Sequence, residues 1–358
     1  MVRARVMVAM SGGVDSSVAA LLLKEEGYDV LGVTLKLWDQ GERCVPASSK
    51  VCCSFNDVND ARRVCATLGI PFYVFDYTHL FRSLVIEPFV ETYTSGRTPN
   101  PCILCNQKIK FDIMLKEAHK LGARYLATGH HARMISDDHG GYHLCRGFDG
   151  GKDQSYFLFH LLGQDMSRIL FPVGQYEKSQ LRERAREMGL IVHDKAESME
   201  ICFIPDHDHV RFIEEQYPHK KRKSGHFVDR EGHVLGQHRG IDVYTIGQRK
   251  GLGISLGQRM YVTQIRPQTD EVVLSDAADL LSTHVAARDF ILLNGMKDQM
   301  LTAKIRYRSQ EVGAKVTHWD EEAKKIQVQL QAPVSGVTPG QALVLYCGDE
   351  VVGGGWIE

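Results

Sequence analysis

A glycine turn near the start of the chain carries the clearest chemistry in the sequence. Residues 6–10 form a short apolar run, Ser11-Gly12-Gly13-Val14-Asp15-Ser16-Ser17 follows it, and residues 18–23 are apolar with helical spacing. Glycine lacks a Cβ, so its backbone N–H can approach a ligand closely, and a helix start has unpaired N–H groups at the positive end of its dipole. A strand, a glycine turn and a helix in this order therefore predict an anion-binding site.

The kind of anion follows from the motifs that the turn does and does not match. A Walker loop requires Lys after its last glycine, and a dinucleotide fingerprint requires Gly-x-Gly-x-x-Gly, and the turn contains neither. Ser-Gly-Gly-Val-Asp-Ser, residues 11–16, instead resembles the PP-loop of the N-type ATP pyrophosphatases. That resemblance implies cleavage of ATP into AMP and pyrophosphate, with adenylation of a substrate oxygen. A glycine turn without a ligand is the alternative.

Three cysteines in two distant segments are the next candidates. Pro99-Asn100-Pro101-Cys102-Ile103-Leu104-Cys105-Asn106 contains a Cys-x-x-Cys pair, and Ile201-Cys202-Phe203-Ile204 supplies a third thiol. We expect a loop over residues 95–104 and a helix over residues 106–121, so that Cys105 lies at a helix start, where the dipole favours the reactive thiolate. From these residues alone, buried structural cysteines explain the pattern equally well, and zinc would need a fourth ligand.

Composition restricts the class of protein. The chain has 358 residues, is 43% hydrophobic and 24% charged, and carries a net charge of −1, which fits a globular protein of two or three domains. The run at residues 6–10 is too short for a secretory signal, and no run approaches the ~18 apolar residues of a membrane span. Nine cysteines, an odd number, do not indicate a secreted disulfide scaffold. We therefore expect a protein of the cytoplasm, or else of an organelle matrix, that does not bind a membrane.

Positive charge is concentrated in one segment. Residues 218–250 contain eight Lys or Arg against three acidic residues. A solvated loop and an RNA-binding surface explain this charge equally well. Two further clusters carry less: we expect Cys44, Cys52 and Cys53 to be structural or incidental, and Asp206-His207-Asp208-His209 to be a solvated loop rather than a metal site.

The elements that would position these residues alternate between strands and helices. We expect strands over residues 6–10, 30–37, 71–75 and 124–128, and helices over residues 18–23, 57–68, 79–94 and 106–121. Such alternation predicts an α/β fold with a doubly wound parallel sheet that has helices on both faces. Ligands of such sheets bind beyond the carboxyl ends of the strands, so the turn after Met10, the end of the second strand near Leu35, and Gly129 should converge.

The second half of the chain has a different hydrophobic period. After a helix that starts within residues 151–162 and another over residues 177–188, short alternating runs separated by turn residues dominate from about Pro205. We expect strands over residues 261–265, 271–274, 302–307, 326–330, 342–346 and 351–357. The predicted organisation is a catalytic domain over residues 1–208, a small central domain over residues 209–277 and a C-terminal β-barrel over residues 278–358.

Several further motifs extend the resemblance over nearly the whole chain. Asn100-Pro101-x-x-Leu104-Cys105-Asn106, Ala127-Thr128-Gly129-His130, Lys152-Asp153-Gln154-Ser155-Tyr156 and Ile201-Cys202-Phe203-Ile204 have the order and spacing of the tRNA-specific 2-thiouridylases. Residues 247–253, 304–308 and 339–341 also match that family. The resemblance implies thiolation of the wobble uridine of Lys, Glu and Gln tRNAs. ATP, acting with Mg²⁺, would adenylate the 2-oxygen of uracil, and sulfur would then displace AMP.

Site roles are implied by the resemblance, position by position. Cys105 resembles the family's nucleophile and Cys202 its persulfide-bearing cysteine. The implied partners are tRNA and a sulfur donor, which is a cysteine desulfurase, a sulfur relay protein or sulfide. The implied ATP contacts are Ala9, Met10, Ser11, Gly12, Gly13, Val14, Asp15, Ser16, Leu35 and Gly129, the target-base contacts are Asn100, Pro101 and Cys102, and the other tRNA contacts are His130, Lys152, Asp153, Gln154, Arg306, Tyr307 and Gln341.

The chain departs from part of the family at Cys102, where many members have Asp. A thiol does not replace a carboxylate in acid-base chemistry. Cys102, Cys105 and Cys202 are instead a suitable set for a 4Fe-4S cluster with one iron open to bind sulfide, which is the reading that we favour. The other route is a persulfide on Cys202, followed by a disulfide between Cys105 and Cys202. A second, smaller departure is His131, where other members often have Tyr.

Two other classes of protein share parts of this pattern. A small-molecule ligase or amidotransferase on the same ATP-splitting domain, such as an argininosuccinate or NAD synthetase, explains residues 11–17 equally well. It has no use for the three cysteines or for a basic segment followed by a barrel. An RNA-binding module without catalysis is the other class, and the intact Ser-Gly-Gly-Val-Asp-Ser motif argues against it.

Overall fold

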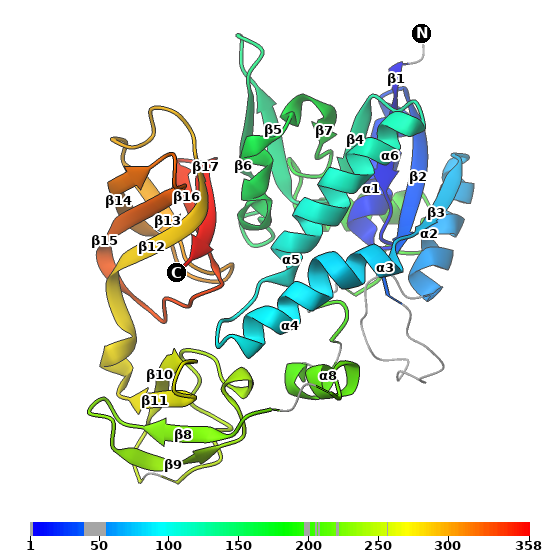
Figure 1. The fold of residues 1–358 in the computed structure, drawn as a ribbon. Coiled ribbons are helices and arrows are strands. Elements are labelled where there is room, and N and C mark those ends of the chain that lie inside the picture. The colour runs from blue at the N-terminus through cyan, green and yellow to red at the C-terminus, as the bar shows by residue number, and fades with distance from the viewer. Residues whose placement is uncertain are drawn as a thin grey trace. The chain divides into compact units, whose positions relative to one another are not determined.

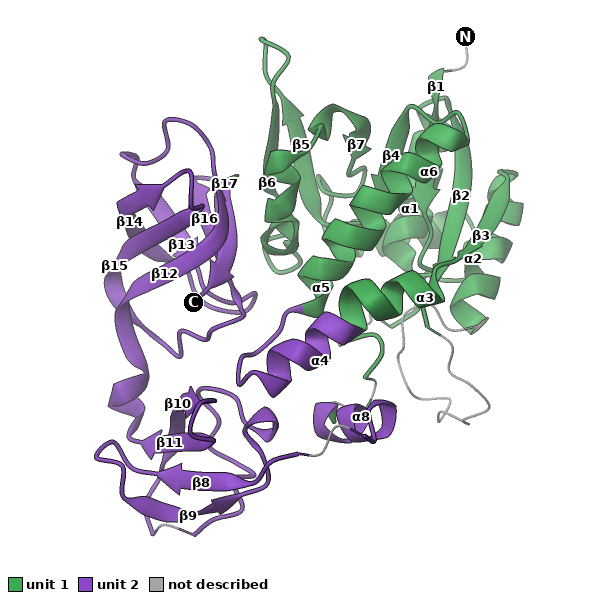
Figure 2. Cartoon of the chain, viewed as in Figure 1, with its two compact units in different colours: residues 1–86, 101–208, 349–351 green, residues 87–100, 209–348, 352–358 purple. Residues whose placement is uncertain are grey.

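The computed structural model describes residues 3–38, 55–196, 201–204, 206, 208–219, 222–255 and 257–358 (Figure 1). The chain forms two compact units, of which unit 1 is residues 1–86, 101–208 and 349–351 and unit 2 is residues 87–100, 209–348 and 352–358 (Figure 2). The expectations about Cys44, Cys52, Cys53 and His207, and the part of the basic segment at Lys220 and Lys221, lie outside the described residues.

A five-stranded parallel sheet forms the centre of unit 1, in the order β3-β2-β1-β4-β7. Its middle strand has no exposed face, since Val6, Met7 and Val8 are fully buried. Val6 and Val8 pack with the helices on one face, and the alternation of a strand turns Met7 to the other. The strands are β1 (Arg3–Ala9), β2 (Tyr28–Lys36), β3 (Phe72–Asp76), β4 (Tyr125–Thr128) and β7 (Ile169–Leu170).

Helices cover both faces of this sheet, which confirms the predicted α/β class (Figure 1). The first two helices share an apolar core with the last one, α7, whose Leu181 and Ala185 are buried. A hairpin, β5 (Ala132–Ser136) and β6 (Tyr142–Arg146), follows β4. The helical segments of unit 1 are α1 (Val14–Glu25), α2 (Phe55–Leu68), α3 (Thr78–Phe81), η1 (Arg82–Ile86), α5 (Pro101–Leu104), η2 (Cys105–Ile113), α6 (Met114–Lys120), η3 (Ser155–Gly163), η4 (Met166–Arg168) and α7 (Lys178–Glu187).

The helix that carries the Cys-x-x-Cys pair starts earlier than we predicted. The expected loop over residues 95–104 ends at Asn100, because α5 begins at Pro101 and continues through η2 into α6. Proline is favoured as the first residue of a helix, since its fixed φ is helical and its missing N–H would have no partner there. The turn signals of Pro99 and Pro101 therefore mark a helix start rather than a loop. The helix that we expected to start within residues 151–162 is the 3₁₀ segment η3, which begins at Ser155.

Unit 2 contains a small sheet and a closed barrel. The sheet has the order β10-β11-β8-β9, and in the barrel β12-β15-β14-β13-β16-β17 the pair Ala287 and Ile357 joins the first and last strands. The predicted barrel is confirmed. The elements of unit 2 are α4 (Glu87–Thr94), α8 (His209–Gln216), β8 (Gly225–Val228), β9 (Val234–His238), η5 (Ile241–Val243), β10 (Tyr261–Arg266), β11 (Glu271–Ser275), η6 (Ala277–Leu280), β12 (Leu281–Leu292), β13 (Leu301–Lys304), β14 (Val312–Asp320), β15 (Lys325–Ser335), β16 (Ala342–Cys347) and β17 (Glu350–Ile357).

Within the described residues, no helix has both the length and the apolar character that a bilayer crossing needs.

The strand expected over residues 302–307 ends at Lys304, because residues 305–309 turn, with Ser309 donating its hydroxyl to the Arg306 carbonyl.

Gly129, directly after β4, lies against the backbone of the first turn of α1. A Cβ at this position would lie 2.5 Å from the Ser16 backbone nitrogen and 2.6 Å from the Asp15 carbonyl carbon. We expect Gly129→Ala to lower the free energy of unfolding by about 1–3 kcal/mol, the usual cost of overpacking, in urea denaturation followed by tryptophan fluorescence. Gly150→Ala is the control, since a Cβ there meets nothing within 4 Å. Equal stability of the two variants would contradict the close approach.

Candidate active site

The turn after β1 is held by hydrogen bonds among its own residues, and the start of α1 that follows it has no side-chain cap. The Ser11 N–H donates to the Ser16 hydroxyl at 3.1 Å, and the Ser17 hydroxyl donates to the Gly13 carbonyl at 2.8 Å. Gly12 has a φ of 70° and lies directly against the Asp57 carbonyl, so no side chain fits there. Gly13 caps α1 without a side-chain hydrogen bond, which leaves the first N–H groups of the helix available to an anion.

Three strand ends meet at this turn, as the sheet order requires. Ala9 of β1 pairs with Val33 of β2 and Thr128 of β4, so the residues that follow these strands share one edge. The Thr34 hydroxyl donates to the Met10 carbonyl at 2.8 Å. Leu35 is buried beside this edge, and Gly129 lies against the start of α1. The turn, Leu35 and Gly129 therefore converge as predicted.

Asp15, in the first turn of α1, has two basic partners from other parts of unit 1. Lys178 Nζ lies 2.6 Å and His131 Nε2 3.1 Å from its Oδ1 atom. Burial raises the pKa of Asp15, but the hydrogen bond with His131 and the charge of Lys178 outweigh burial, so the pKa is below its usual value. Asp15 is therefore an ionised carboxylate beside a buried ammonium group.

A second lysine, Lys195, binds the segment that packs against the turn. Lys195 Nζ lies 2.7 Å from Asp57 Oδ1 and 2.5 Å from Asp60 Oδ2, and the Asp57 carbonyl contacts Gly12. Burial lowers the pKa of Lys195, but its hydrogen bonds to the two carboxylates outweigh burial and raise it. Sequence reasoning missed both Lys178 and Lys195, because each is separated from its partner by more than a hundred residues. Neither lies in a motif with a phosphate-binding signature.

The three candidate cysteines belong to neighbouring segments of unit 1. Cys102 is exposed, Cys105 is buried and Cys202 is partly exposed, and all three are thiols rather than halves of a disulfide. The Phe203 ring packs edge-on against Phe81 at 5.7 Å, and η1, which continues α3, packs on α5. The segment of Cys202 is therefore attached to the helix that contacts the segment of Cys102.

The start of the helix at Pro101 decides which thiol the helix dipole activates. Our expectation that Cys105 lies at the start of its helix is wrong, because Pro101 begins the helix and Cys102 occupies its first turn. The dipole effect fades beyond the first turn, so it favours a thiolate at Cys102 rather than at Cys105. Cys105 instead lies at the junction of α5 with the π-helical segment η2, an irregularity that often occurs at functional sites.

The cysteines do not form a site for a single metal ion. Within the described ranges, the one group of three His, Cys, Asp or Glu ligands whose atoms all lie within 4.8 Å of one another is Asp229, Glu231 and His233. The three thiols are thus further apart than the ligands of one zinc ion would be. A four-iron cluster separates its cysteine ligands further than a single ion does, so this observation does not exclude it.

Several expected tRNA contacts of unit 1 have structural partners. His130 is buried, with Nδ1 2.7 Å from the Thr128 hydroxyl, and burial with the charge of Lys110 lowers its pKa well below the usual value. Asp153 is buried and accepts hydrogen bonds from the Gly147 and Ser155 N–H groups. Lys152 and Gln154 beside it are partly exposed, and Gln154 Oε1 accepts from the His131 N–H.

The expected contacts of the barrel also have partners within unit 2. The Arg306 guanidinium donates to the Gly336 carbonyl, and the Lys304 ammonium lies over the Tyr307 ring. Gln341 Nε2 donates to the carbonyls of Thr98 at 3.1 Å and Pro99 at 3.0 Å. Gln341 therefore holds the loop that carries Asn100, which leads directly into Pro101 and the cysteine helix.

This contact predicts a change in loop mobility. Arg97 is exposed in the same loop, so trypsin can report how often the loop opens. We expect Gln341→Ala to raise the rate of cleavage after Arg97 about tenfold without any ligand, because two hydrogen bonds of about 0.5–1.5 kcal/mol each are lost. Gln327→Ala is the control, since Gln327 is exposed on β15. Unchanged cleavage in Gln341→Ala would show that the loop is held by other contacts.

Comparisons with known proteins match this arrangement along the whole chain. A family model described as "tRNA methyl transferase HUP domain" matches residues 4–206, and one described as "tRNA methyl transferase PRC-barrel domain" matches residues 211–276. A third, described as "Aminomethyltransferase beta-barrel domain", matches residues 282–357. Among solved structures, a 4-thiouridine synthetase–RNA complex with bound ATP has a TM-score of 0.35 at 17% identity, covering 60% of this chain and 50% of that chain. That likeness is too low to carry an argument.

Curated relatives are similar over their full length. The tRNA-specific 2-thiouridylase MnmA of Carboxydothermus hydrogenoformans is 49% identical over 360 residues, which cover 99% of this chain and 98% of the relative. The MnmA of Geobacter metallireducens is 47% identical, covering 99% of this chain and 97% of the relative. MnmA 1 of Clostridium botulinum is 48% identical, covering 99% of both chains. The chain therefore belongs to the family of the tRNA-specific 2-thiouridylases.

Proposed function

We propose that the protein catalyses ATP-dependent 2-thiolation of the wobble uridine of Lys, Glu and Gln tRNAs. The observation that carries the proposal is the turn of residues 11–17, whose Asp15 binds Lys178. This turn lies in the same unit as the helix of Cys102 and Cys105. Relatives that match over their full length are named tRNA-specific 2-thiouridylases, which supports the proposal. A small-molecule ligase would share the turn but not the three thiols.

ATP would bind with its phosphates at the turn. The uncapped N–H groups at the start of α1 suit the β- and γ-phosphates, and Leu35 and Gly129 at the same edge suit the adenosine. Lys178 supplies the positive charge that a pyrophosphate leaving group needs, at a buried position where charge acts strongly. Mg²⁺ prefers oxygen ligands, so ionised Asp15 together with phosphate oxygens would hold it.

Adenylation solves the chemical problem of replacing oxygen by sulfur. The uracil 2-oxygen attacks the α-phosphorus of ATP, and the bond to the bridging oxygen breaks, which releases pyrophosphate. Sulfur then adds at carbon 2, and AMP leaves with the former 2-oxygen. The turn contributes by stabilising the charge that develops on pyrophosphate, and a base flipped out of the anticodon would be held by residues 100–102.

Cys102, Cys105 and Cys202 would supply the sulfur site. Three thiols on contacting segments form a donor set that fits a 4Fe-4S cluster, whose open iron would bind sulfide. The other route uses a persulfide on Cys202, whose terminal sulfur bonds to carbon 2 of the uracil. The Cys105 thiolate then attacks Cys202 Sγ and breaks the bond between the two persulfide sulfurs. The thiolated uridine is released, and a disulfide between Cys105 and Cys202 remains. External thiols would reduce that disulfide. Sulfide would serve the cluster route, and a cysteine desulfurase or a relay protein, which transfers sulfur from its own persulfide, would serve the persulfide route.

Unit 2 would bind the body of the tRNA. The domains that we expect over residues 209–277 and 278–358 carry the basic segment and the residues Arg306, Tyr307 and Gln341. The net charge of the whole chain is −1, so local surfaces rather than a global field would attract the RNA. We place the enzyme in the cytoplasm, where its tRNA substrate is found.

Removal of single thiols should separate adenylation from sulfur transfer. We expect Cys105→Ala to abolish formation of 2-thiouridine while tRNA-dependent release of pyrophosphate continues, because the turn is left intact. Mass spectrometry of tRNA nucleosides and a coupled pyrophosphate assay measure the two steps. Cys347→Ala, in the barrel strand β16, is the control and should leave both steps unchanged. Full thiolation by Cys105→Ala would refute the role of this cysteine, and pyrophosphate release stimulated by aspartate or ammonia instead of tRNA would indicate a ligase.

The two sulfur routes predict different metal contents. If the cluster route operates, protein purified without oxygen contains about four iron and four sulfide per chain, loses thiolation when a chelator removes the iron, and regains it on reconstitution. Cys102→Ala then loses iron binding as well. Iron-free protein that thiolates tRNA at full rate with a cysteine desulfurase as donor would contradict the cluster and support the persulfide route.

A further inference from the structure

We propose that Lys195 is a positioning residue for ATP, through which α7 and residues 190–195 hold the start of α2 against the turn of residues 11–17. The inference rests on the proposed function, because it takes ATP as the ligand of that turn. Neither the sequence motifs nor the family resemblance assigns a role to Lys195 or to its partners Asp57 and Asp60.

The start of α2 touches the turn through the backbone of Asp57. A Cβ added to Gly12 would lie 2.8 Å from both the carbonyl carbon and the Cα atom of Asp57. Gly12 itself has a φ of 70°, a conformation that glycine adopts without strain. Because the two backbones are packed this closely, a movement of α2 changes the support of the turn. The position of Asp57 therefore helps to set the shape of the turn.

Lys195 binds two carboxylates on this helix. Asp57 and Asp60 are three residues apart on α2, so they share a face of the helix, and Lys195 Nζ lies 2.7 Å from Asp57 Oδ1 and 2.5 Å from Asp60 Oδ2. The side chains of Asp57 and Lys195 are only 11% and 29% exposed, so solvent screens this pair less than a surface pair. Loss of the ammonium group would remove the positive charge that balances a largely buried carboxylate, which is costly.

The segment that carries Lys195 is fixed to α7. Arg182 of α7 donates from Nη1 to the His193 carbonyl at 2.7 Å and from Nη2 to the Lys195 carbonyl at 3.0 Å. Leu190 and Val192 of the same segment are buried in the apolar core that α7 shares with α1. Lys195 therefore extends from a rigid base, and its ammonium group can hold α2 at a defined position.

The same helix also holds α1. Lys178, the first residue of α7, has its Nζ atom 2.6 Å from Oδ1 of Asp15 in the first turn of α1. Lys178 and Lys195 thus connect one rigid element to α1, which follows the turn, and to α2, which packs on it. A turn held in this way keeps its shape before ATP binds, so less reorganisation is needed when charge develops on pyrophosphate.

A double-mutant cycle on ATP affinity tests the role of Lys195. The variants are Lys195→Met and Lys195→Arg, with Lys195→Met repeated in the Asp57→Asn and Asp60→Asn backgrounds. The dissociation constant for ATP with Mg²⁺ is measured by titration calorimetry without tRNA, at a temperature where thermal unfolding curves show every variant to be folded. The KM values for ATP and for tRNA in pyrophosphate release are measured in parallel.

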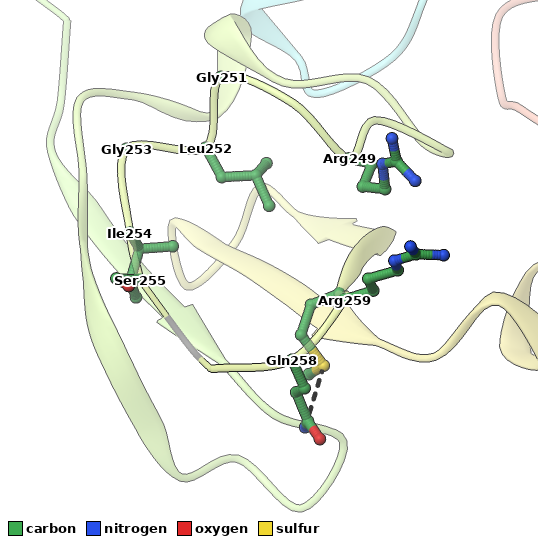
Figure 3. A pocket seen from close by; sticks show the side chains of 9 residues that line it. Arg249, Gly251, Leu252, Gly253, Ile254, Ser255, Gln258 and Arg259 are labelled. Carbon is green, nitrogen blue, oxygen red and sulfur yellow. Dashed lines mark hydrogen bonds between the residues drawn. The ribbon is translucent and has the colours of Figure 1, made fainter.

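Two controls remove a positive charge elsewhere. Lys120→Met breaks an exposed ion pair with Glu117 on α6 of unit 1. Arg259→Gln removes a charge from unit 2, where Arg259 lines a cavity of residues 249–260 (Figure 3). Both variants should bind ATP like the wild type, because neither residue contacts the turn or α2.

We expect Lys195→Met to raise the dissociation constant and the KM for ATP about tenfold, with the KM for tRNA unchanged. Lys195→Arg should stay within about threefold of the wild type, because a guanidinium keeps the charge and pairs with carboxylates. In the Asp57→Asn background Lys195→Met should add less than about twofold, because the two residues act through one contact. In the Asp60→Asn background its effect should persist, because Asp57 still needs its partner.

The possible contradictions are distinct. If Lys195→Met binds ATP like the wild type, while the wild type releases pyrophosphate with tRNA, the positioning role is excluded and the proposed function stands. If Lys195→Met weakens ATP binding equally with and without the Asp57 carboxylate, Lys195 does not act through Asp57 and the inference is wrong. A wild-type protein that neither binds ATP nor releases pyrophosphate with tRNA would refute the proposed function, and this inference with it.

Discussion

The close approach of β4 to the first turn of α1 is the contact on which the rest of the site depends. Gly129 leaves room for the backbone of Asp15 and Ser16, and Gly12 leaves room for the Asp57 carbonyl. A turn confined between two backbones cannot adjust its shape around a ligand, so its N–H groups are arranged before ATP arrives. This preorganisation stabilises a leaving pyrophosphate without further reorganisation.

Charge is added to this turn from segments far along the chain. Lys178 and His131 hold Asp15, and Lys195 holds the Asp57 segment, so three basic side chains surround a motif that itself contains none. The barrel has a similar role for the loop before Pro101, where Gln341 binds the carbonyls of Thr98 and Pro99. A barrel that binds tRNA would thus also hold the loop that leads to the target-base residues.

Local pattern was enough to predict the class of fold and the sheet edge. The run at residues 6–10 is uniformly apolar because β1 is buried on both faces, and glycines mark the ends of the neighbouring elements. The strands β12 and β14 were missed because exposed polar residues interrupt their alternation. The start of the cysteine helix was missed because Pro101 was interpreted as part of a loop, although proline suits the first position of a helix.

The partners of the site residues could not be predicted in this way. The pairs Asp15 with Lys178 and Gln341 with Thr98 join residues 163 and 243 positions apart, and nothing in the local sequence of either member indicates the other. The resemblance to a family named candidate residues and their implied ligands, but it did not say which residues of the chain contact one another. The buried position of Asp153 and its bonds to backbone N–H groups follow only from the folded chain.

The central claim is that the uracil 2-oxygen becomes part of AMP. It is tested most directly with tRNA whose target uridine carries ¹⁸O at carbon 2, which is converted by the enzyme in the presence of ATP and a sulfur donor. The account predicts that the released AMP contains one ¹⁸O in its phosphate group for each uridine thiolated, as measured by mass spectrometry. AMP without ¹⁸O, formed while thiolation proceeds, would contradict adenylation of the base and with it the proposed role of the turn.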